Sequence, residues 1–309
     1  MTEGGPHHGV LVVDKPEGPT SHDVVDAVRR ALRVRRVGHT GTLDPFATGV
    51  LPVCVGKATR LARFLGGGDK VYRATVRLGF ATSTDDRLGE ALGAPRAVRL
   101  EPGAVVSALL ALRERTEQLP PTYSAKHVGG RRAYELAREG REVPRQPVPV
   151  TVHTLDLLER RGDELTLEVR CSPGTYVRAL ARDLGEALGT GGHLTALRRT
   201  RSGAFGLEEA VALDRVEADG ARSLVPLSRL LSDLPMVRVG SEGRTALRHG
   251  RDLDRALVLE GFPADPAPRL RVIDEEGALV ALVVPRGFSP LPSELPSSPT
   301  LHPDLVLMD

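Results

Sequence analysis

Hydrophobic and polar positions alternate along the chain in blocks that predict both strands and helices. An apolar run at 9–13 predicts a first strand. Apolar residues spaced three and four apart from Val24 to Leu32 then predict a helix, which either Thr20 or Ser21 caps. Further along, the pattern gives an apolar run at 50–55, helices over 57–64, 103–115 and 176–188, and an alternating strand over 71–80.

The second half of the chain changes character after Pro235. Residues 150–170 predict two strands that flank a turn at 161–163. Beyond Pro235, short apolar stretches at 237–239, 257–259, 270–273 and 279–284 alternate with turns, which is typical of a small all-β module. The segment 289–303 is rich in Pro and Ser and predicts a loosely held tail, although 305–307 could still pair with a sheet.

Charge is distributed unevenly over the 309 residues, although the formal net charge is only +2. Residues 1–201 hold 31 Lys and Arg against 23 Asp and Glu, whereas 202–309 hold 11 against 17. A basic body favours a polyanionic partner, but Arg-rich surfaces also occur without one. Two cysteines give no disulfide framework, and no leader or membrane-length apolar run is seen, so we expect a cytoplasmic protein.

The segment 36–49 is the strongest candidate for chemistry. Three glycines and several short hydroxyl residues bracket a single carboxylate, Asp44, and Pro45 stiffens the loop directly after it. A carboxylate with no second acid nearby suits a nucleophile better than a paired acid and base. The alternative is that Asp44 only caps the turn that follows it. The histidines show no metal-ligand spacing, so no metal site is expected.

Several ordered motifs resemble those of the TruB family, the bacterial tRNA pseudouridine-55 synthases. Residues 38–52 resemble the active-site motif of that family. The other matching segments are 11–21, 70–74, 82–89, 120–140, 172–178 and 193–203, in the family's order. The resemblance spans about 9–203 and extends more loosely into the C-terminal module.

The resemblance implies an α+β fold, with a mixed, largely antiparallel sheet in a catalytic domain over 1–233. An RNA-gripping insertion would occupy about 120–147, a PUA-like β-barrel 235–288, and the tail 289–309. The implied reaction isomerises a uridine in the T-arm of tRNA to pseudouridine without cofactor or metal. The protein would act as a monomer that needs no protein partner.

The resemblance also implies roles for three catalytic residues. Asp44 would be the nucleophile, attacking either the base or the sugar of the target uridine. Arg178 would pair with Asp44 and keep it ionised, although it could instead form an ordinary surface salt bridge. Tyr72 would stack on the target base and take the proton from C5, although its strand pattern is equally compatible with a plain core residue.

The remaining site residues are implied RNA contacts. His39 would fill the space that the target base vacates, or else hydrogen bond only within its loop. Lys15 would support the active-site loop or contact a carboxylate or phosphate. The resemblance also includes Thr42 and Leu197 in the substrate site. It assigns phosphate contacts to the basic residues Lys126, Arg131, Arg132, Arg141 and Arg145. Those basic residues could instead form a solvated charged face.

Two other functions remain open at this point. One is a guide-RNA-dependent relative that shares the Asp motif, against which the insertion at about 120–147 argues. The other is a noncatalytic protein that binds or folds tRNA, against which the intact set of Asp44, Tyr72 and Arg178 argues.

Overall fold

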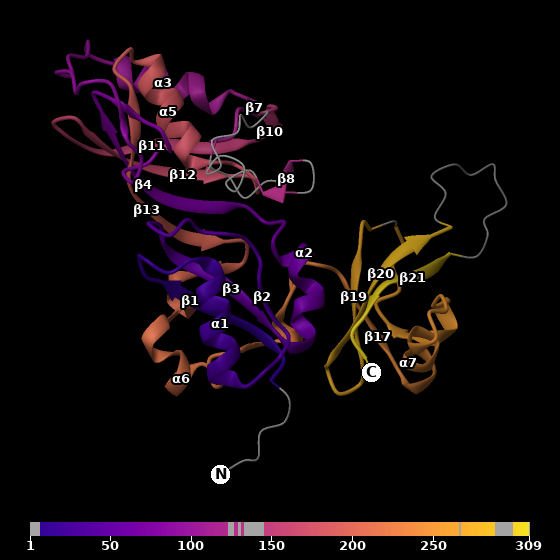
Figure 1. The fold of residues 1–309 in the computed structure, drawn as a ribbon. Helices are drawn as coiled ribbons and strands as arrows, with labels where there is room; N and C mark the ends of the chain where they lie inside the picture. The colour runs from indigo at the N-terminus through magenta and orange to yellow at the C-terminus, as the bar shows by residue number, and fades with distance from the viewer. Residues whose placement is uncertain are drawn as a thin grey trace, which may run out of the picture.

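The computed structural model describes residues 7–122, 127–128, 131–132, 145–265, 267–287 and 299–308. Figure 1 shows a larger N-terminal body and a smaller C-terminal module, drawn in orange and yellow. The body is built on a ten-stranded sheet and the module on a five-stranded sheet. The chain is therefore divided near Leu234, close to where its composition changes.

The ten-stranded sheet is mixed and largely antiparallel, as the family resemblance predicted. Its main path runs β11-β12-β4-β13-β3-β1-β15, and β2, β14 and β16 attach to its members. Among the strand pairs within the described ranges of this sheet, β13–β3 and β1–β15 are parallel and the others are antiparallel. Its strands are β1 (Gly9–Lys15), β2 (Val37–His39), β3 (Thr48–Val55), β4 (Lys70–Leu78), β11 (Val152–Arg161), β12 (Glu164–Cys171), β13 (Gly192–Ser202), β14 (Phe205–Gly206), β15 (Val211–Ala212) and β16 (Val225–Pro226).

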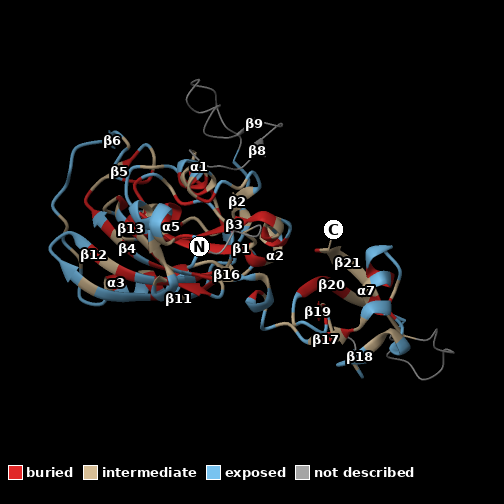
Figure 2. Cartoon of the chain, turned by 90° about the horizontal axis from the view of Figure 1, so that it is seen from below, coloured by how far each residue is buried: buried red, intermediate tan, exposed pale blue. Residues whose placement is uncertain are grey.

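Three helices cover one face of this sheet and bury its main core. They are α1 (Ser21–Leu32), α3 (Ala104–Arg113) and α5 (Val177–Ala187). The first helix begins where predicted, because Thr20 and Asp23 form a capping box. The alternation over β4 is confirmed: its even-numbered residues are buried, and Tyr72, Ala74 and Val76 join the core under the helices. Figure 2 shows the buried residues along the central strands.

The opposite face is covered over β1 and β3 by a second core. Here the predicted helix at 57–64 proves to be a 3-10 helix, Gly56–Leu61, followed by the single turn α2 (Ala62–Leu65). Side chains from the C-terminal module, including Leu279 and Leu282, pack into the same core. Phe64 on α2 also lies under the guanidinium groups of both Arg63 and Arg269. The module is thus packed directly against the body.

Over its described residues the C-terminal module is a five-stranded sheet, and the expected closed barrel is not confirmed. Its strands are ordered β18 (Val258–Glu260), β17 (Met236–Val239), β19 (Leu270–Ile273), β20 (Leu279–Arg286) and β21 (Thr300–Val306), with α7 (Ser241–Arg248) beside them. No pairing between β18 and β21 closes a ring within the described ranges. The strand β21 lies inside 289–309, the segment expected to be a tail. Leu301 and Leu307 of this segment are buried, so its last residues are part of the module.

The remaining short elements connect these layers. They are β5 (Ala81–Thr82), β6 (Ala91–Leu92), β7 (Glu117–Gln118), β8 (His127–Val128), β9 (Arg131–Arg132), β10 (Val148–Pro149), α6 (Val216–Asp219) and the 3-10 turns 207–209, 213–215, 227–229 and 255–257. Within the predicted RNA-gripping insertion, β8 and β9 form a short antiparallel pair. Lys126 and Arg141 lie outside the described residues. Arg131 and Arg132 form β9, whose backbone alone is described.

Candidate active site

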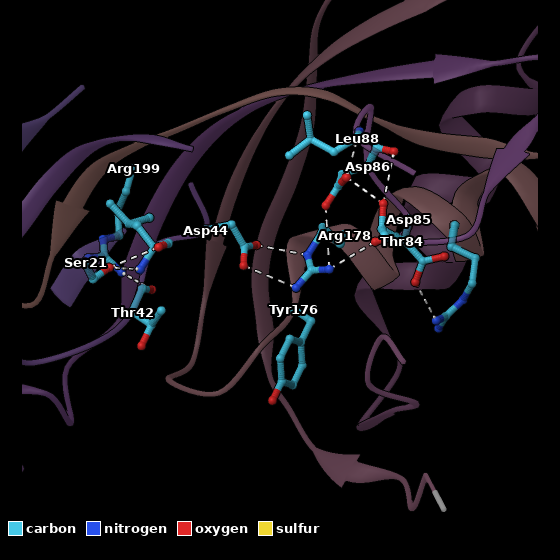
Figure 3. Close-up of polar contacts among 12 residues, drawn as sticks. Ser21, Thr42, Asp44, Thr84, Asp85, Asp86, Leu88, Tyr176, Arg178 and Arg199 are labelled. Carbon is cyan, nitrogen blue, oxygen red and sulfur yellow. Dashed lines mark hydrogen bonds and ion pairs between the residues drawn. The ribbon is translucent and has the colours of Figure 1, made fainter. Parts of the chain in front are cut away.

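Asp44 lies on the loop that connects β2 to β3, in the wall of a cavity of about 400 Å³. The backbone turns after Asp44, where the amide of Ala47 donates to the Asp44 carbonyl at 3.0 Å. The side chain does not cap this turn. Its carboxylate instead faces the Arg178 guanidinium, as Figure 3 shows. The alternative interpretation of Asp44 as a turn cap is therefore wrong.

Arg178 holds the Asp44 carboxylate with two of its nitrogen atoms. Nε lies 2.9 Å from Asp44 Oδ2, and Nη2 donates to Oδ1 at 3.3 Å. Arg178 is the second residue of α5, and its Nη1 donates to the Thr84 carbonyl at 3.0 Å and lies 3.6 Å from Asp86 Oδ2. The Arg178 side chain is only 7% exposed, whereas that of Asp44 is 34% exposed. This is a buried, oriented cation beside a carboxylate that opens to the cavity, not a surface salt bridge.

Burial and neighbouring charges act against each other on the Asp44 carboxyl. Burial raises its pKa above the ordinary value, because the charged form loses water. The Arg178 guanidinium opposes that shift, whereas the Asp86 carboxylate adds to it. Arg178 therefore favours the ionised form of Asp44 without fully cancelling the cost of burial.

Buried polar side chains hydrogen bond to the backbone of the Asp44 loop and fix its conformation. The Ser21 hydroxyl at the start of α1 accepts from the Leu43 amide at 2.8 Å and lies 3.0 Å from the Leu43 carbonyl, to which it donates. Lys15 is fully buried, and its Nζ donates to the carbonyls of Pro16 at 2.8 Å and Pro45 at 3.2 Å. Lys15 thus lies where it supports the loop, and no part of it reaches the surface that RNA could contact.

Arg199 on β13 provides the third support and was given no role by sequence reasoning. Nε donates to the Val50 carbonyl at 2.7 Å, and the Nη atoms donate to the carbonyls of Thr42 at 3.3 Å and Gly41 at 3.2 Å. Figure 3 shows Arg199 beside Thr42, on the far side of Asp44 from Arg178. The sequence did contain a signal for the position of Arg199. It lies two residues from Leu197, a predicted site residue, and a strand places such residues on the same face.

Gly49 is the point where the loop returns to the sheet, and only glycine fits there. Its φ is +103°, a conformation that L residues with a Cβ rarely adopt. A Cβ at this position would lie 2.1 Å from the Arg199 carbonyl oxygen. The close approach of β3 and β13 therefore places the Asp44 loop directly above the Arg199 backbone.

The cavity wall contains five of the predicted site residues, fewer than half of them. Asp44, Tyr72, Arg178, Thr42 and Leu197 line it. Tyr72 lies on the core face of β4 and also lines the cavity, so it is a core residue whose position leaves its predicted role at the target base a prediction. Burial raises the pKa of the Tyr72 phenol, and the charge and hydrogen bonding of Arg199 oppose that shift.

His39 stands outside the cavity lining. It lies on β2, paired with Val53 of β3, and immediately precedes Thr40, which does line the cavity. Lys70 and Tyr176 line the cavity as well, although sequence reasoning gave neither a role. Among the described residues, no group of three or more His, Cys, Asp or Glu is placed to hold a metal ion. None of the helices within the described ranges is long and apolar enough to cross a membrane.

Comparisons with known proteins point to one family. The model for the N-terminal domain of TruB family pseudouridylate synthases matches residues 29–177, and the model for the tRNA pseudouridylate synthase B C-terminal domain matches 178–234. A protein of Symbiobacterium thermophilum named tRNA pseudouridine synthase B is 50% identical over 78% of this chain and 82% of its own length. A relative of the same name from Mycobacterium bovis is 42% identical over 98% of this chain and 100% of its own length.

Solved structures share the fold over nearly the whole chain. A chain in a crystal structure of a Cbf5-Nop10-Gar1 complex superposes with a TM-score of 0.73 at 26% identity, covering 98% of this chain and 85% of that one. A chain of an H/ACA RNP bound to a substrate RNA containing 2′-deoxyuridine gives a TM-score of 0.68 at 25% identity, covering 99% and 92%.

Proposed function

The chain belongs to the TruB family of pseudouridylate synthases, and from that premise we propose that it converts the uridine at position 55 in the T-loop of tRNA into pseudouridine. The observation that carries this proposal is the Asp44–Arg178 pair at the cavity. One carboxylate is open to a ligand there, is oriented by a buried guanidinium, and has Tyr72 and Leu197 beside it. The volume of about 400 Å³ lies within the range of small-molecule sites.

The target uridine has to leave the stacked T-loop to reach Asp44, which costs a few kcal/mol. Inside the cavity, Asp44 attacks the base or the sugar while Arg178 holds its carboxylate in line. The bond between C1′ and N1 breaks, and C5 of the same ring bonds to C1′. Tyr72 stacks on the ring and takes the proton from C5, and N1 gains a proton. Product and substrate are isomers, so the net reaction consumes no other reactant.

RNA contacts outside the cavity complete the proposal. The basic residues of the insertion, Lys126, Arg131, Arg132 and Arg141, contact phosphates of the T-arm and fix its register. His39 lies next to the cavity-lining Thr40 and occupies the space that the flipped nucleotide leaves in the RNA. The protein acts as a monomer in the cytoplasm and needs no guide RNA or protein partner.

The test is conversion of an unmodified tRNA transcript by the purified protein, without added metal or nucleotide. Asp44→Asn keeps the shape of the side chain and removes its charge, and Asp163→Asn is a matched control at an exposed hairpin residue. We expect pseudouridine at position 55 with the native protein and the control, and binding without conversion by Asp44→Asn.

Other outcomes would contradict the proposal in different ways. Binding without conversion by all three proteins would show a tRNA-binding or tRNA-folding protein, or one that depends on a guide. Conversion at a different uridine would contradict the T-loop assignment alone. Conversion by Asp44→Asn at the native rate would contradict the nucleophile.

A further inference from the structure

Arg199 is a buried cation in the cavity wall. It is 1% exposed, and its strand register places it directly opposite Tyr72 of β4. Its guanidinium donates to three backbone carbonyls, those of Gly41, Thr42 and Val50. Carbonyl dipoles satisfy its hydrogen bonds, but they leave its full positive charge uncompensated.

Lys70 is a second buried cation in the same wall, 6% exposed. Its Nζ donates to the Gly66 carbonyl at 2.6 Å and to the Gly68 carbonyl. Its neighbour in sequence, Asp69, pairs instead with Arg170 at 2.9 Å and with His153 at 3.2 Å. Within the part of the chain that the structure describes, neither Lys70 nor Arg199 forms an ion pair with a carboxylate.

Two buried cations without acidic partners are costly for a fold to keep. Burial lowers the pKa of the Lys70 ammonium, and the positive charge of Arg199 lowers it further. The same charge opposes the rise that burial causes in the pKa of the Tyr72 phenol, so the field of Arg199 reaches both side chains. The wall between Lys70 and Arg199 is therefore electropositive before any ligand enters. Such a fixed charge is most useful to a reaction in which negative charge develops inside the cavity.

We propose that Arg199, together with Lys70, stabilises the negative charge that develops on the uracil ring during isomerisation. This inference rests on the proposed function and identifies the positively charged groups that face the uracil ring. If Asp44 attacks C1′, the electron pair of the breaking C1′–N1 bond stays with the ring, which leaves as an anion. If Asp44 adds to C6, the displaced electron pair moves to O4 as an enolate. The ring is anionic on both routes, and the charge disappears once the bond from C5 to C1′ has formed and the C5 proton has moved.

The test compares two substrates that differ in how well the ring itself carries negative charge. A T-arm RNA carries either uridine or 5-fluorouridine at the target position. Fluorine at C5 withdraws electrons and stabilises the ring anion without help from the protein. Single-turnover loss of the original nucleoside is measured by nuclease digestion and chromatography, with enzyme in excess.

Arg199→Gln removes the charge and keeps hydrogen-bond donors. We expect its rate on uridine to fall by about 10²-fold, the typical effect of removing one group that stabilises a developing anion. On 5-fluorouridine the loss should be several-fold smaller. Arg199→Lys should recover part of the rate on uridine. The matched control is Arg198→Gln. Arg198 is the neighbouring arginine; it pairs with Asp14 at 2.7 Å and does not line the cavity. Any change in rate that this control causes should be the same for the two substrates.

Equal losses on the two substrates for Arg199→Gln would overturn the inference and leave Arg199 as a support of the loop. A native rate on uridine would overturn it as well. If Arg199→Gln does not fold, Lys70→Met carries the same comparison, with the same expected difference between substrates. If the native protein does not convert uridine at all, the proposed function fails, and this inference fails with it.

Discussion

Gly49 offers the sharpest test of how the fold positions Asp44. In Gly49→Ala the new Cβ would lie 2.1 Å from the Arg199 carbonyl oxygen, whereas real Cβ contacts essentially never fall below 3.0 Å. The strands β3 and β13 must therefore separate by about 0.9 Å. The substitution also forces alanine to adopt a φ near +103°.

The expected cost has two parts. The backbone conformation costs about 1–3 kcal/mol, and the steric overlap adds about 1–3 kcal/mol. Because Arg199 bonds to the carbonyls of Gly41 and Thr42, a shift of β13 also moves the Asp44 loop. A displacement of about 1 Å in catalytic geometry can cost 10²-fold in rate. We therefore expect a loss of activity well beyond the loss of folded protein.

Gly162→Ala is the matched control. Gly162 has a φ of +57° in an exposed hairpin turn, and nothing lies within 4 Å of the position of a new Cβ. It places alanine at a positive φ without any steric overlap, and its φ is the less costly of the two for alanine, so it sets a lower bound on the conformational part of the cost. Urea unfolding gives both stabilities, and single-turnover conversion of tRNA transcript is then measured at a temperature where both variants are folded. If Gly49→Ala unfolds no more easily than Gly162→Ala, or converts tRNA at the native rate, the positioning argument is refuted.

Three further predictions concern charge. Arg178→Met removes the group that opposes the raised pKa of Asp44, so the acid limb of the single-turnover pH–rate profile should move to higher pH; an unmoved limb would contradict this. Burial lowers the pKa of Lys15 to about 8 from 10.5, so the unfolded state binds more protons between those values and stability rises with pH across that window. Urea unfolding at several pH values should show that rise in the native protein, and Lys15→Met should lack it. Replacing both Arg131 and Arg132 by Ala should weaken tRNA binding and reduce the magnitude of the slope of log K against log salt by about 1–2. The single-turnover rate at saturating enzyme should not change, and an unchanged slope would exclude phosphate contacts by these two residues.

The sequence predicted most helices and strands of the body, because the residues that determine each of them lie within the element or next to it. The helix α1 follows from its capping residues and from apolar positions at spacings of three and four. The strand β4 follows from strict alternation between buried and more exposed positions. The segment 57–64 differs, because Gly56 has a φ of +62° and the chain tightens into a 3-10 helix before α2.

Features that depend on distant parts of the chain could not be predicted in the same way. Strand patterns in the C-terminal module located most of its strands, but they contain no information on whether the sheet closes. The strand β21 follows a Pro/Ser-rich segment, and only its pairing with β20 shows that it belongs to the module. The burial of Arg199 was harder to predict, because an arginine in a basic stretch normally indicates an exposed position, and only its spacing of two residues from Leu197 indicated the opposite.

The Asp44 loop shows why the site needs buried cations at all. Leu43, Phe46 and Ala47 anchor this loop in the main core, but the Thr-Gly-Thr segment at 40–42 has no large apolar side chain to fix its backbone. Carbonyls of the loop accept instead from Lys15 and Arg199, two cations that the sheet holds beneath it. Those contacts leave the Asp44 carboxylate itself free to face Arg178 and the cavity. Of these two cations, Arg199 also lines the cavity, so under our proposal the residue that fixes the Asp44 loop also supplies positive charge to the reacting ring.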